Sequence, residues 1–205
     1  MNEIVTIKNK TAVYANDDIS LDPTTYVSYC TFDSYCVPEI LSCEQENAIY
    51  GGDTTNATKV GTVNGMLVMG SQAKKQRIEL YGVCDSECAD LEYMHSALSK
   101  NDGPLTKNKY LDIFFIDSIK MNEGYDTDEY KEKILEFSPE VILAYYNIYP
   151  DIICDYIPPL ASVGGKTLKV DEEKTALFAL YKRLGFIEHS NTGFLYKVCN
   201  NNIRK

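Results

Sequence analysis

The segment from Tyr110 to Met121 constrains the fold of this chain more than any other. It is apolar and rich in β-branched residues, and it contains Ile113, Phe114, Phe115, Ile116 and Ile119. A strand with apolar side chains on both faces has to be covered on both faces. The segment is therefore predicted to be a buried strand at the centre of a sheet.

The residues before this strand predict two more strands and two helices. Residues 26–32 alternate as a strand does, and 38–48 form a helical pattern with Pro38 in its first turn. Residues 59–70 form one strand, or two strands with Asn64-Gly65 as the hairpin turn. A helix capped by Asp85 or Ser86 runs to residue 98, with His95 packed or half-exposed beside its apolar face, which holds Leu91, Met94 and Leu98.

The residues after the central strand alternate between helix and strand. A helix starts at Thr127 or Asp128 and is interrupted at Ser138-Pro139, where Ser138 can cap a second helix. An apolar strand follows over 151–160, and a helix over 171–184 ends at Gly185 in a left-handed cap. Residues 186–190 and 193–199 then predict an antiparallel pair of strands.

Composition limits both the domain organisation and the partners. The 205 residues are 44% apolar, enough for one domain in which residues 1–58 form an N-terminal elaboration packed on a core of residues 59–205. The net charge of −10 opposes binding to nucleic-acid phosphates and favours a basic partner or substrate. Imitation of DNA by an acidic surface is an alternative interpretation.

The cysteines and the N-terminus predict a cytoplasmic protein without a metal. Seven dispersed cysteines include only one close pair, Cys84 and Cys88, so they are interpreted as reduced core residues and no metal site is expected. The chain has no apolar run of about 18 residues and no secretory signal at its start. No association with a membrane is expected.

Two groups of residues resemble the GNAT N-acetyltransferase superfamily. The segment 179–186, which ends Tyr181-Lys182-Arg183-Leu184-Gly185-Phe186, and the hairpin after it resemble the closing part of that fold. The segments 84–91, 111–121 and 122–125 are similar to one bacterial branch, so the resemblance covers residues 59–197. It implies an α/β (α+β) fold with a mixed, mostly antiparallel central sheet flanked by helices.

The resemblance also implies where acetyl-CoA would bind. In that superfamily the thioester chain pairs with exposed backbone of the central strand, here at Ile119 and Met121, and a glycine-rich loop cradles the pyrophosphate. The loop falls on Asp126, Thr127, Asp128, Glu129, Tyr130 and Lys131, where Asp126 replaces a basic or amide residue and both glycines are lost. One like-charge contact costs about 4 kcal/mol at about 4 Å. The sequence therefore predicts a diverged member that has lost its cofactor.

Two catalytic residues are implied if the chain is active. Tyr181 matches the tyrosine that protonates the departing thiolate, and Asp117 is the carboxylate available as a general base on the central strand. Alternatively, Tyr181 packs on the apolar face of its helix, and Asp117 is a solvated acid at the end of the strand.

Three hypotheses about function follow. The first is a non-catalytic binding or regulatory protein that engages a protein partner through an acidic, tyrosine-rich surface. One version is a viral inhibitor of a host defence factor, in the host-cell cytoplasm. The alternative is an acyl-CoA-dependent N-acetyltransferase acting on an amine of a small molecule or protein, and a third is a cleft that binds another ligand. The tyrosines considered for contact are Tyr26, Tyr29, Tyr35, Tyr50, Tyr145, Tyr146 and Tyr149.

Overall fold

The computed structural model describes residues 3–8, 23–37, 42–50, 53–157, 162–163, 166–167, 172–190 and 192–199. The strands are β1 Glu3–Lys8, β2 Val27–Val37, β3 Thr58–Met69, β4 Asp112–Met121, β5 Ile152–Tyr156, β6 Ser162–Val163, β7 Lys166–Thr167, β8 Ile187–Glu188 and β9 Phe194–Val198. The helices are the 3-10 helix η1 Pro23–Tyr26 and α1 Cys43–Tyr50, α2 Gly70–Lys75, α3 Leu80–Glu87, α4 Ala89–Leu98, α5 Pro104–Lys107, α6 Asp128–Tyr146 and α7 Glu172–Arg183.

Seven strands form the main sheet, in the order β1-β2-β3-β4-β5-β9-β8. Only the pair β4-β5 is parallel, and the other five pairs are antiparallel. The predicted mixed, mostly antiparallel sheet flanked by helices is therefore confirmed. The buried central strand of the sequence analysis is β4, which is the fourth strand of the seven.

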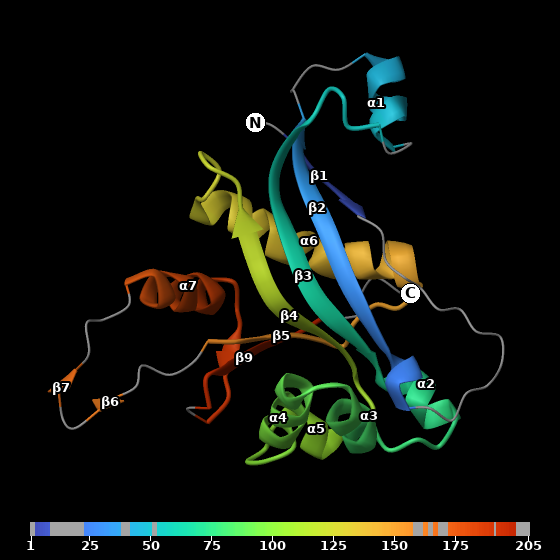
Figure 1. Cartoon of the computed structure of the whole chain (residues 1–205), viewed down its shortest axis with the longest axis vertical. Helices are drawn as coiled ribbons and strands as arrows, with labels where there is room; N and C mark the ends of the chain where they lie inside the picture. Colours follow the sequence, from blue (N-terminus) through green and yellow to red (C-terminus); the bar gives the residue numbers. More distant parts are fainter. Residues whose placement is uncertain are drawn as a thin grey trace.

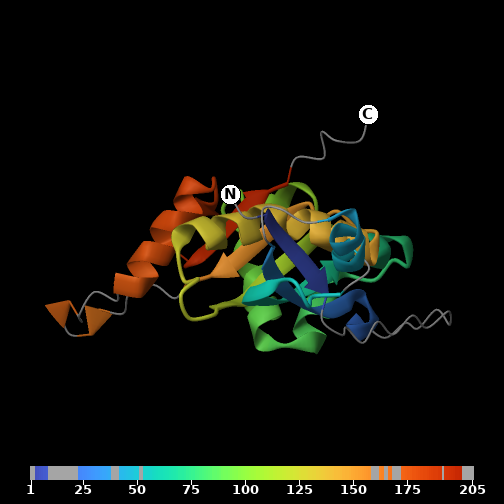
Figure 2. The same cartoon turned by 90° about the horizontal axis from the view of Figure 1, so that it is seen from above.

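Helices cover both faces of this sheet (Figures 1 and 2). Helices α6 and α7 lie on one face, and α3, α4 and α5 lie on the other. Each face has its own apolar cluster: Ile142 and Leu180 belong to the first, and Leu91 and Met94 to the second. Burial of these two clusters against one sheet is the main favourable contribution to folding.

Strand β4 changes its environment halfway along its length. Residues 112–116 are buried, whereas Asp117 is exposed and the rest of the strand is only partly covered. The change occurs because the parallel ladder with β5 covers only Ile113 to Ile116. Beyond that point the two strands diverge (Figure 1), and the edge of β4 that faces β5 pairs with no other strand that the structure describes.

The Asn64-Gly65 dipeptide is not a hairpin turn, so the alternative with two strands over 59–70 is wrong. Both residues lie inside the continuous strand β3, and the register with β4 shifts between them. Asn64 is opposite Ser118 and Gly65 is opposite Ile116, so Asp117 is the extra residue of a β-bulge. A Cβ on Gly65 would lie 2.5 Å from the carbonyl oxygen of Phe115, so the glycine serves close strand approach instead of a turn.

The predicted helix over 85–98 is two helices, α3 and α4. Cys88 separates them with an extended backbone at φ −163° and ψ 160°. Leu91, Met94 and Leu98 are buried, and His95 is partly exposed, as the sequence spacing predicted. In the N-terminal region α1 begins at residue 43, while Pro38, the predicted first turn, is outside the described residues.

The predicted interruption at Ser138-Pro139 is also wrong. Helix α6 continues through both residues for 19 residues in all. Pro139 removes a backbone donor, but the Ser138 hydroxyl turns back and donates to the Ile134 carbonyl at 2.7 Å, so it does not cap a new helix. The tertiary packing of Leu135 and Ile142 on the sheet holds the helix in one piece.

The C-terminal elements follow the sequence prediction closely. Helix α7 ends at residue 183, and Gly185 adopts a φ of +85°, the left-handed conformation that glycine permits. Strands β8 and β9 form the predicted antiparallel pair. The rings of Tyr181 and Phe186 meet edge to face at 4.6 Å, which fastens the end of α7 to the following strand.

Candidate functional site

The divergence of β4 from β5 opens a cleft with a volume of about 240 Å³. Its walls come from the second half of β4, the end of β5, the first turn of α6 and one face of α7. The lining residues are Asp117, Ser118, Ile119, Asp128, Lys131, Asp155, Tyr156, Ile157, Ala176, Leu177, Leu180 and Tyr181. The cleft is therefore apolar on the α7 side and contains several charged groups elsewhere.

Tyr181 and Asp155 form a hydrogen-bonded pair at the base of this cleft. Tyr181 is fully buried, and its hydroxyl donates to Oδ2 of Asp155 at 2.5 Å. Burial raises the pKa of Asp155 to about 6, and the nearby charge of Asp117 also raises it, against the hydrogen bonds from Tyr181 and the Tyr156 amide. Burial raises the pKa of Tyr181 well above its usual value. The Tyr181 hydroxyl is thus buried and hydrogen-bonded to a carboxylate, which agrees with the interpretation of Tyr181 as a packed residue.

Asp117 stands where the bulge in β4 meets the cleft. It is exposed, and it lines both the cleft and a second cavity on the opposite side of the strand. Of the two residues expected near acetyl-CoA, Ile119 lines the cleft, whereas Met121 packs against the apolar cluster under α6 and does not line it.

The acids at the position where the resemblance places a pyrophosphate loop are ion-paired in the structure. Asp126 pairs with Lys131, and Asp128 pairs with Arg183 from α7 at 3.1 Å. Arg183 also contacts Glu132, and Lys133 pairs with Glu129 at 3.0 Å. The bases therefore offset much of the like-charge repulsion that the sequence of the loop implied.

The geometry of the loop still differs from that of a phosphate cradle. Helix α6 begins after Thr127, whose side chain makes no capping hydrogen bond, and Glu129 and Lys131 bring side chains to the positions where the resemblance expects glycines. The ring of Tyr130 turns toward Tyr125, 5.3 Å away, and packs against the apolar cluster. Any Cβ at these positions limits how closely a phosphate can approach the backbone.

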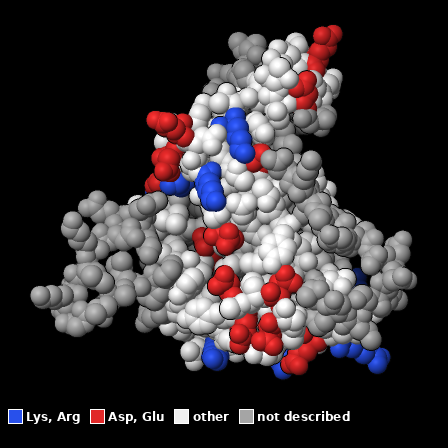
Figure 3. All heavy atoms as spheres, in the orientation of Figure 1, with Lys and Arg blue, Asp and Glu red and all other residues white. Residues whose placement is uncertain are grey.

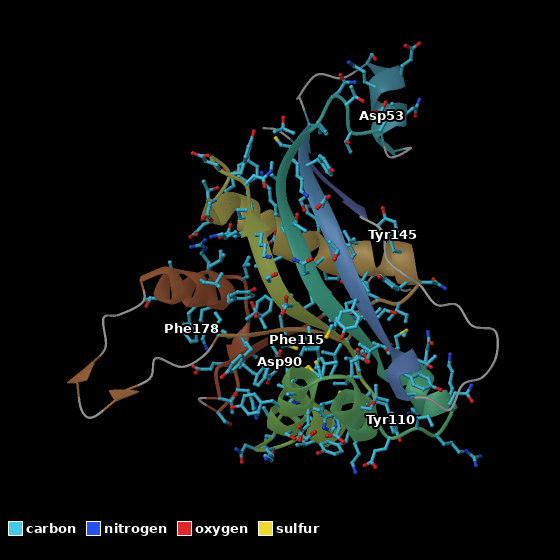
Figure 4. The ribbon with its side chains drawn as sticks, in the orientation of Figure 1. Asp53, Asp90, Tyr110, Phe115, Tyr145 and Phe178 are labelled. Atoms are coloured by element: carbon cyan, nitrogen blue, oxygen red, sulfur yellow. The ribbon has the colours of Figure 1, made fainter. Side chains whose placement is uncertain are left out.

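The second cavity has a volume of about 540 Å³ and lies between the bent central strands and the junction of α3 with α4. In Figure 4 the side chain of Asp90 lies between α4 and these strands, whereas Tyr145 lies at the far end of α6. The lining residues are Tyr29, Cys30, Thr31, Asn64, Gly65, Met66, Cys88, Asp90, Asp117, Ser118 and Lys120. Its charged groups are the carboxylates of Asp90 and Asp117 and the ammonium of Lys120.

An acidic surface adjoins this cavity on α3 and α4. Between Ile78 and Ser99 the chain has no lysine or arginine. We call the acids of this stretch the α3–α4 acidic face, and none of them forms an ion pair within the described residues. Figure 3 shows acidic side chains gathered over this part of the molecule. The face consists of Glu79, Asp85, Glu87, Asp90 and Glu92.

Three exposed tyrosines lie on or beside the α3–α4 acidic face. Tyr29 is 59% exposed and donates to Glu87 at 2.7 Å, which raises the pKa of Tyr29 to about 12. Tyr81 donates to Glu92 at 3.2 Å, and Tyr93 is 48% exposed. Burial lowers the pKa of His95, against the opposing charge of Glu79, so the fold disfavours a positive charge on this imidazole, whose ring meets that of Tyr81 edge to face.

The tyrosines expected at a contact surface are distributed unevenly. Tyr26 is buried in the core and is therefore unavailable for contact, whereas Tyr29 is exposed. Tyr81 and Tyr93, with the acids around them, were missed by the sequence analysis. The signal that could have found them is the run of five acids without a base between residues 78 and 99.

The cysteines show no sign of metal binding in the described part of the chain. All seven are free thiols, and Cys30, Cys36, Cys84 and Cys154 are buried as small core residues. The described side chains form no group of three that could ligate a metal ion. Within the same residues, no helix has the length and apolar character needed to cross a membrane.

Comparison of this chain with protein-family models, with curated proteins and with solved structures finds no match.

Proposed function

We propose that this chain is a non-catalytic binding protein, built on a GNAT-like frame, that engages a basic protein partner through the α3–α4 acidic face. The observation that carries the proposal is the uncompensated charge of that face. The five acids within 78–99 form no ion pair among the described residues, and acidic side chains gather over α3 and α4 in Figure 3. Negative charge of this density attracts lysine and arginine side chains and accelerates association with a basic partner.

The exposed tyrosines support the same function. Tyr29, Tyr81 and Tyr93 combine apolar rings with hydroxyl groups, and two of the hydroxyls bond to acids of the face. Tyrosine is enriched in contact surfaces because it buries a large area at a low cost in conformational entropy. Inhibition of a host factor is one form that such binding could take.

The cleft supports loss of acetyl transfer. The Tyr181 hydroxyl, which would act as the general acid, donates to Asp155, and side chains occupy the positions of the loop glycines. Without a cradle for the pyrophosphate, acetyl-CoA loses a large part of its binding energy. We therefore expect no cofactor.

A direct test uses two peptides of equal length, one rich in arginine and one rich in glutamate, titrated into the protein while fluorescence anisotropy is recorded. We expect saturable binding of the arginine peptide that weakens as salt is added, and no binding of the glutamate peptide. Equal binding of the two peptides, or binding of neither, would contradict the proposal.

A second candidate is an N-acetyltransferase, and one observation favours it. Asp117 lies at the bulge of β4 and lines both the cleft and the larger cavity, the position that a base needs between an acceptor amine and an acyl donor. An acetyl-transfer assay on basic peptides, with Asp117→Asn as the comparison, tests it. Turnover that depends on Asp117 would favour this candidate over the binding protein.

A further inference from the structure

We propose that strand β1 pairs edge to edge with β1 of a second copy of this chain, which joins the two main sheets into one. This surface is separate from the α3–α4 acidic face, so the dimer does not depend on the proposed function. It rests on the open edge of β1, on the position of Tyr145 at the end of α6, and on the low charge around both.

The two edges of the main sheet differ in length. One edge is β8, which has only two residues, and so short a strand offers little for another chain to pair with. The other edge is β1, which pairs with β2 along all six of its residues without a shift in register. The opposite side of β1 pairs with no strand within the described residues.

The sequence of β1 favours pairing with a further strand. Its residues 4–7, Ile-Val-Thr-Ile, are all β-branched, and its charges are confined to the end residues Glu3 and Lys8. The strand has no proline and no bulge, two of the features by which proteins commonly protect an edge. β1 is therefore an open template for another strand.

Tyr145 lies where a strand added to β1 would run. Helix α6 lies against β1, and Tyr145 follows the buried Ser138 by seven residues, about two helical turns, so both are on the sheet-facing side of α6. Tyr145 is nevertheless 42% exposed, at the end of α6 that extends past β1 in Figures 1 and 4. A further strand beside β1 would cover this ring.

Charge identifies a second copy as the occupant. Two chains of net charge −10 repel each other over much of their surface. Residues 141–150, at the end of α6 and after it, contain no charged residue, and the charges of Glu3 and Lys8 cancel. Two copies can therefore approach at this edge with the least repulsion. The stretch also contains three tyrosines, a residue type enriched in interfaces.

Antiparallel pairing makes the edge complementary to itself. A two-fold axis normal to the sheet, near Val5 or Thr6, relates the copies and places β-branched residues opposite one another. Neither Glu3 nor Lys8 then meets the same residue of the second copy. The axis also brings both α3–α4 acidic faces to one side of the joined sheet, where a long basic partner could contact both. Only this last consequence rests on the proposed function.

Sedimentation velocity of the full chain, without a basic partner, measures the self-association. Between about 1 μM and about 300 μM we expect a monomer to convert to a dimer, with a dissociation constant in the micromolar range. A chain that stays monomeric throughout would overturn the dimer and leave the proposed function untouched.

Charge-swap variants place the contact at β1. Position 6 of one copy lies opposite or diagonal to position 6 of the other, so Thr6→Lys and Thr6→Glu should each weaken the dimer by about tenfold or more. An equimolar mixture of the two should associate again, because unlike charges now meet. Circular dichroism checks that both variants fold. Undiminished dimers of the single variants, or no gain on mixing folded variants, would overturn the proposal.

A variant on α6 tests the same edge without altering β1. Tyr145→Ser should weaken the dimer by about tenfold, since it removes a ring that the second copy covers. Phe137→Ser, at another exposed aromatic residue of α6, is the matched control and should leave the dimer unchanged. Equal effects of the two substitutions would place the contact elsewhere and overturn the proposal.

Discussion

The first turn of α6 and the α3–α4 acidic face are both rich in acids, but only the acids at α6 form ion pairs with bases. At α6, Asp126, Asp128 and Glu129 each contact a base, and one of these bases comes from α7. On α3 and α4 the five acids have no such partner among the described residues. The comparison teaches that acidic composition alone does not identify a surface ready for a partner. A surface is available to a basic partner when its acids are not already paired with bases of the same chain.

The strongest test of this comparison neutralises each region separately. Replacing Glu79, Asp85 and Glu92 by their amides should reduce affinity for an arginine-rich peptide by about tenfold or more, because free charges that attract the partner are lost. The matched variant replaces Asp126, Asp128 and Glu129 in the same way and should leave the affinity unchanged. Fluorescence anisotropy measures both, and equal losses would remove the distinction between the regions.

A large effect on stability is expected inside the cleft, where the Tyr181 hydroxyl and the Asp155 carboxylate are hydrogen-bonded to each other. Tyr181→Phe removes a buried hydrogen bond and leaves Asp155 with one partner fewer. The free energy of unfolding measured in urea should therefore fall by about 1–3 kcal/mol. Tyr93→Phe, at an exposed tyrosine, is the control and should change little. An unchanged stability of Tyr181→Phe would mean that the hydrogen bond contributes nothing.

The titration of Asp155 should be detectable as a pH dependence of the free energy of unfolding. Its pKa is raised from 3.8 to about 6 in the fold, so the folded state binds the proton more tightly than the unfolded state does. The stabilisation is complete below the unfolded pKa and is lost as the pH rises through about 6. A shift of this size corresponds to a loss of roughly 1–3 kcal/mol relative to Asp155→Asn.

Urea unfolding of both proteins across this pH range measures the effect. The difference between the wild type and Asp155→Asn should change between acidic and neutral pH and then level off. A constant difference would show that Asp155 does not titrate in this range.

The smallest expected effects have opposite signs in the two regions. Arg183→Gln removes the base that pairs with Asp128 and Glu132, so it should lower the thermal midpoint slightly at low salt. Glu79→Gln removes one of several like charges on the α3–α4 acidic face and should raise the midpoint slightly. Both shifts should vanish at high salt, and differential scanning calorimetry can detect them. Shifts of the same sign would count against the comparison.

The sequence predicted the order of the elements because strong local signals agree with the fold. The apolar run around Phe114 gave the central strand, and Gly185 gave the end of α7. The errors lie where tertiary contacts override a local signal. Gly65 permits close strand approach instead of a turn, and packing on the sheet carries α6 through Pro139.

The candidate site was harder to predict because its properties depend on contacts between distant segments. The pairing of Arg183 with Asp128 joins residues that are 55 positions apart, so no local pattern indicates it. The hydrogen bond from Tyr181 to Asp155 joins two elements in the same way. By contrast, the acids of the α3–α4 acidic face are adjacent in the sequence, and a count of charges over 78–99 would have found them.

The most direct test of the central claim is a calorimetric titration of the chain with acetyl-CoA. The proposal is that the cleft does not bind acetyl-CoA, and that the charge available for binding lies on α3 and α4. We predict no heat of binding at ligand concentrations up to about 1 mM, because Glu129 and Lys131 stand where the resemblance to the GNAT superfamily expects glycines, and the Tyr181 hydroxyl is bonded to Asp155. A dissociation constant in the micromolar range would contradict the claim and favour an acetyltransferase.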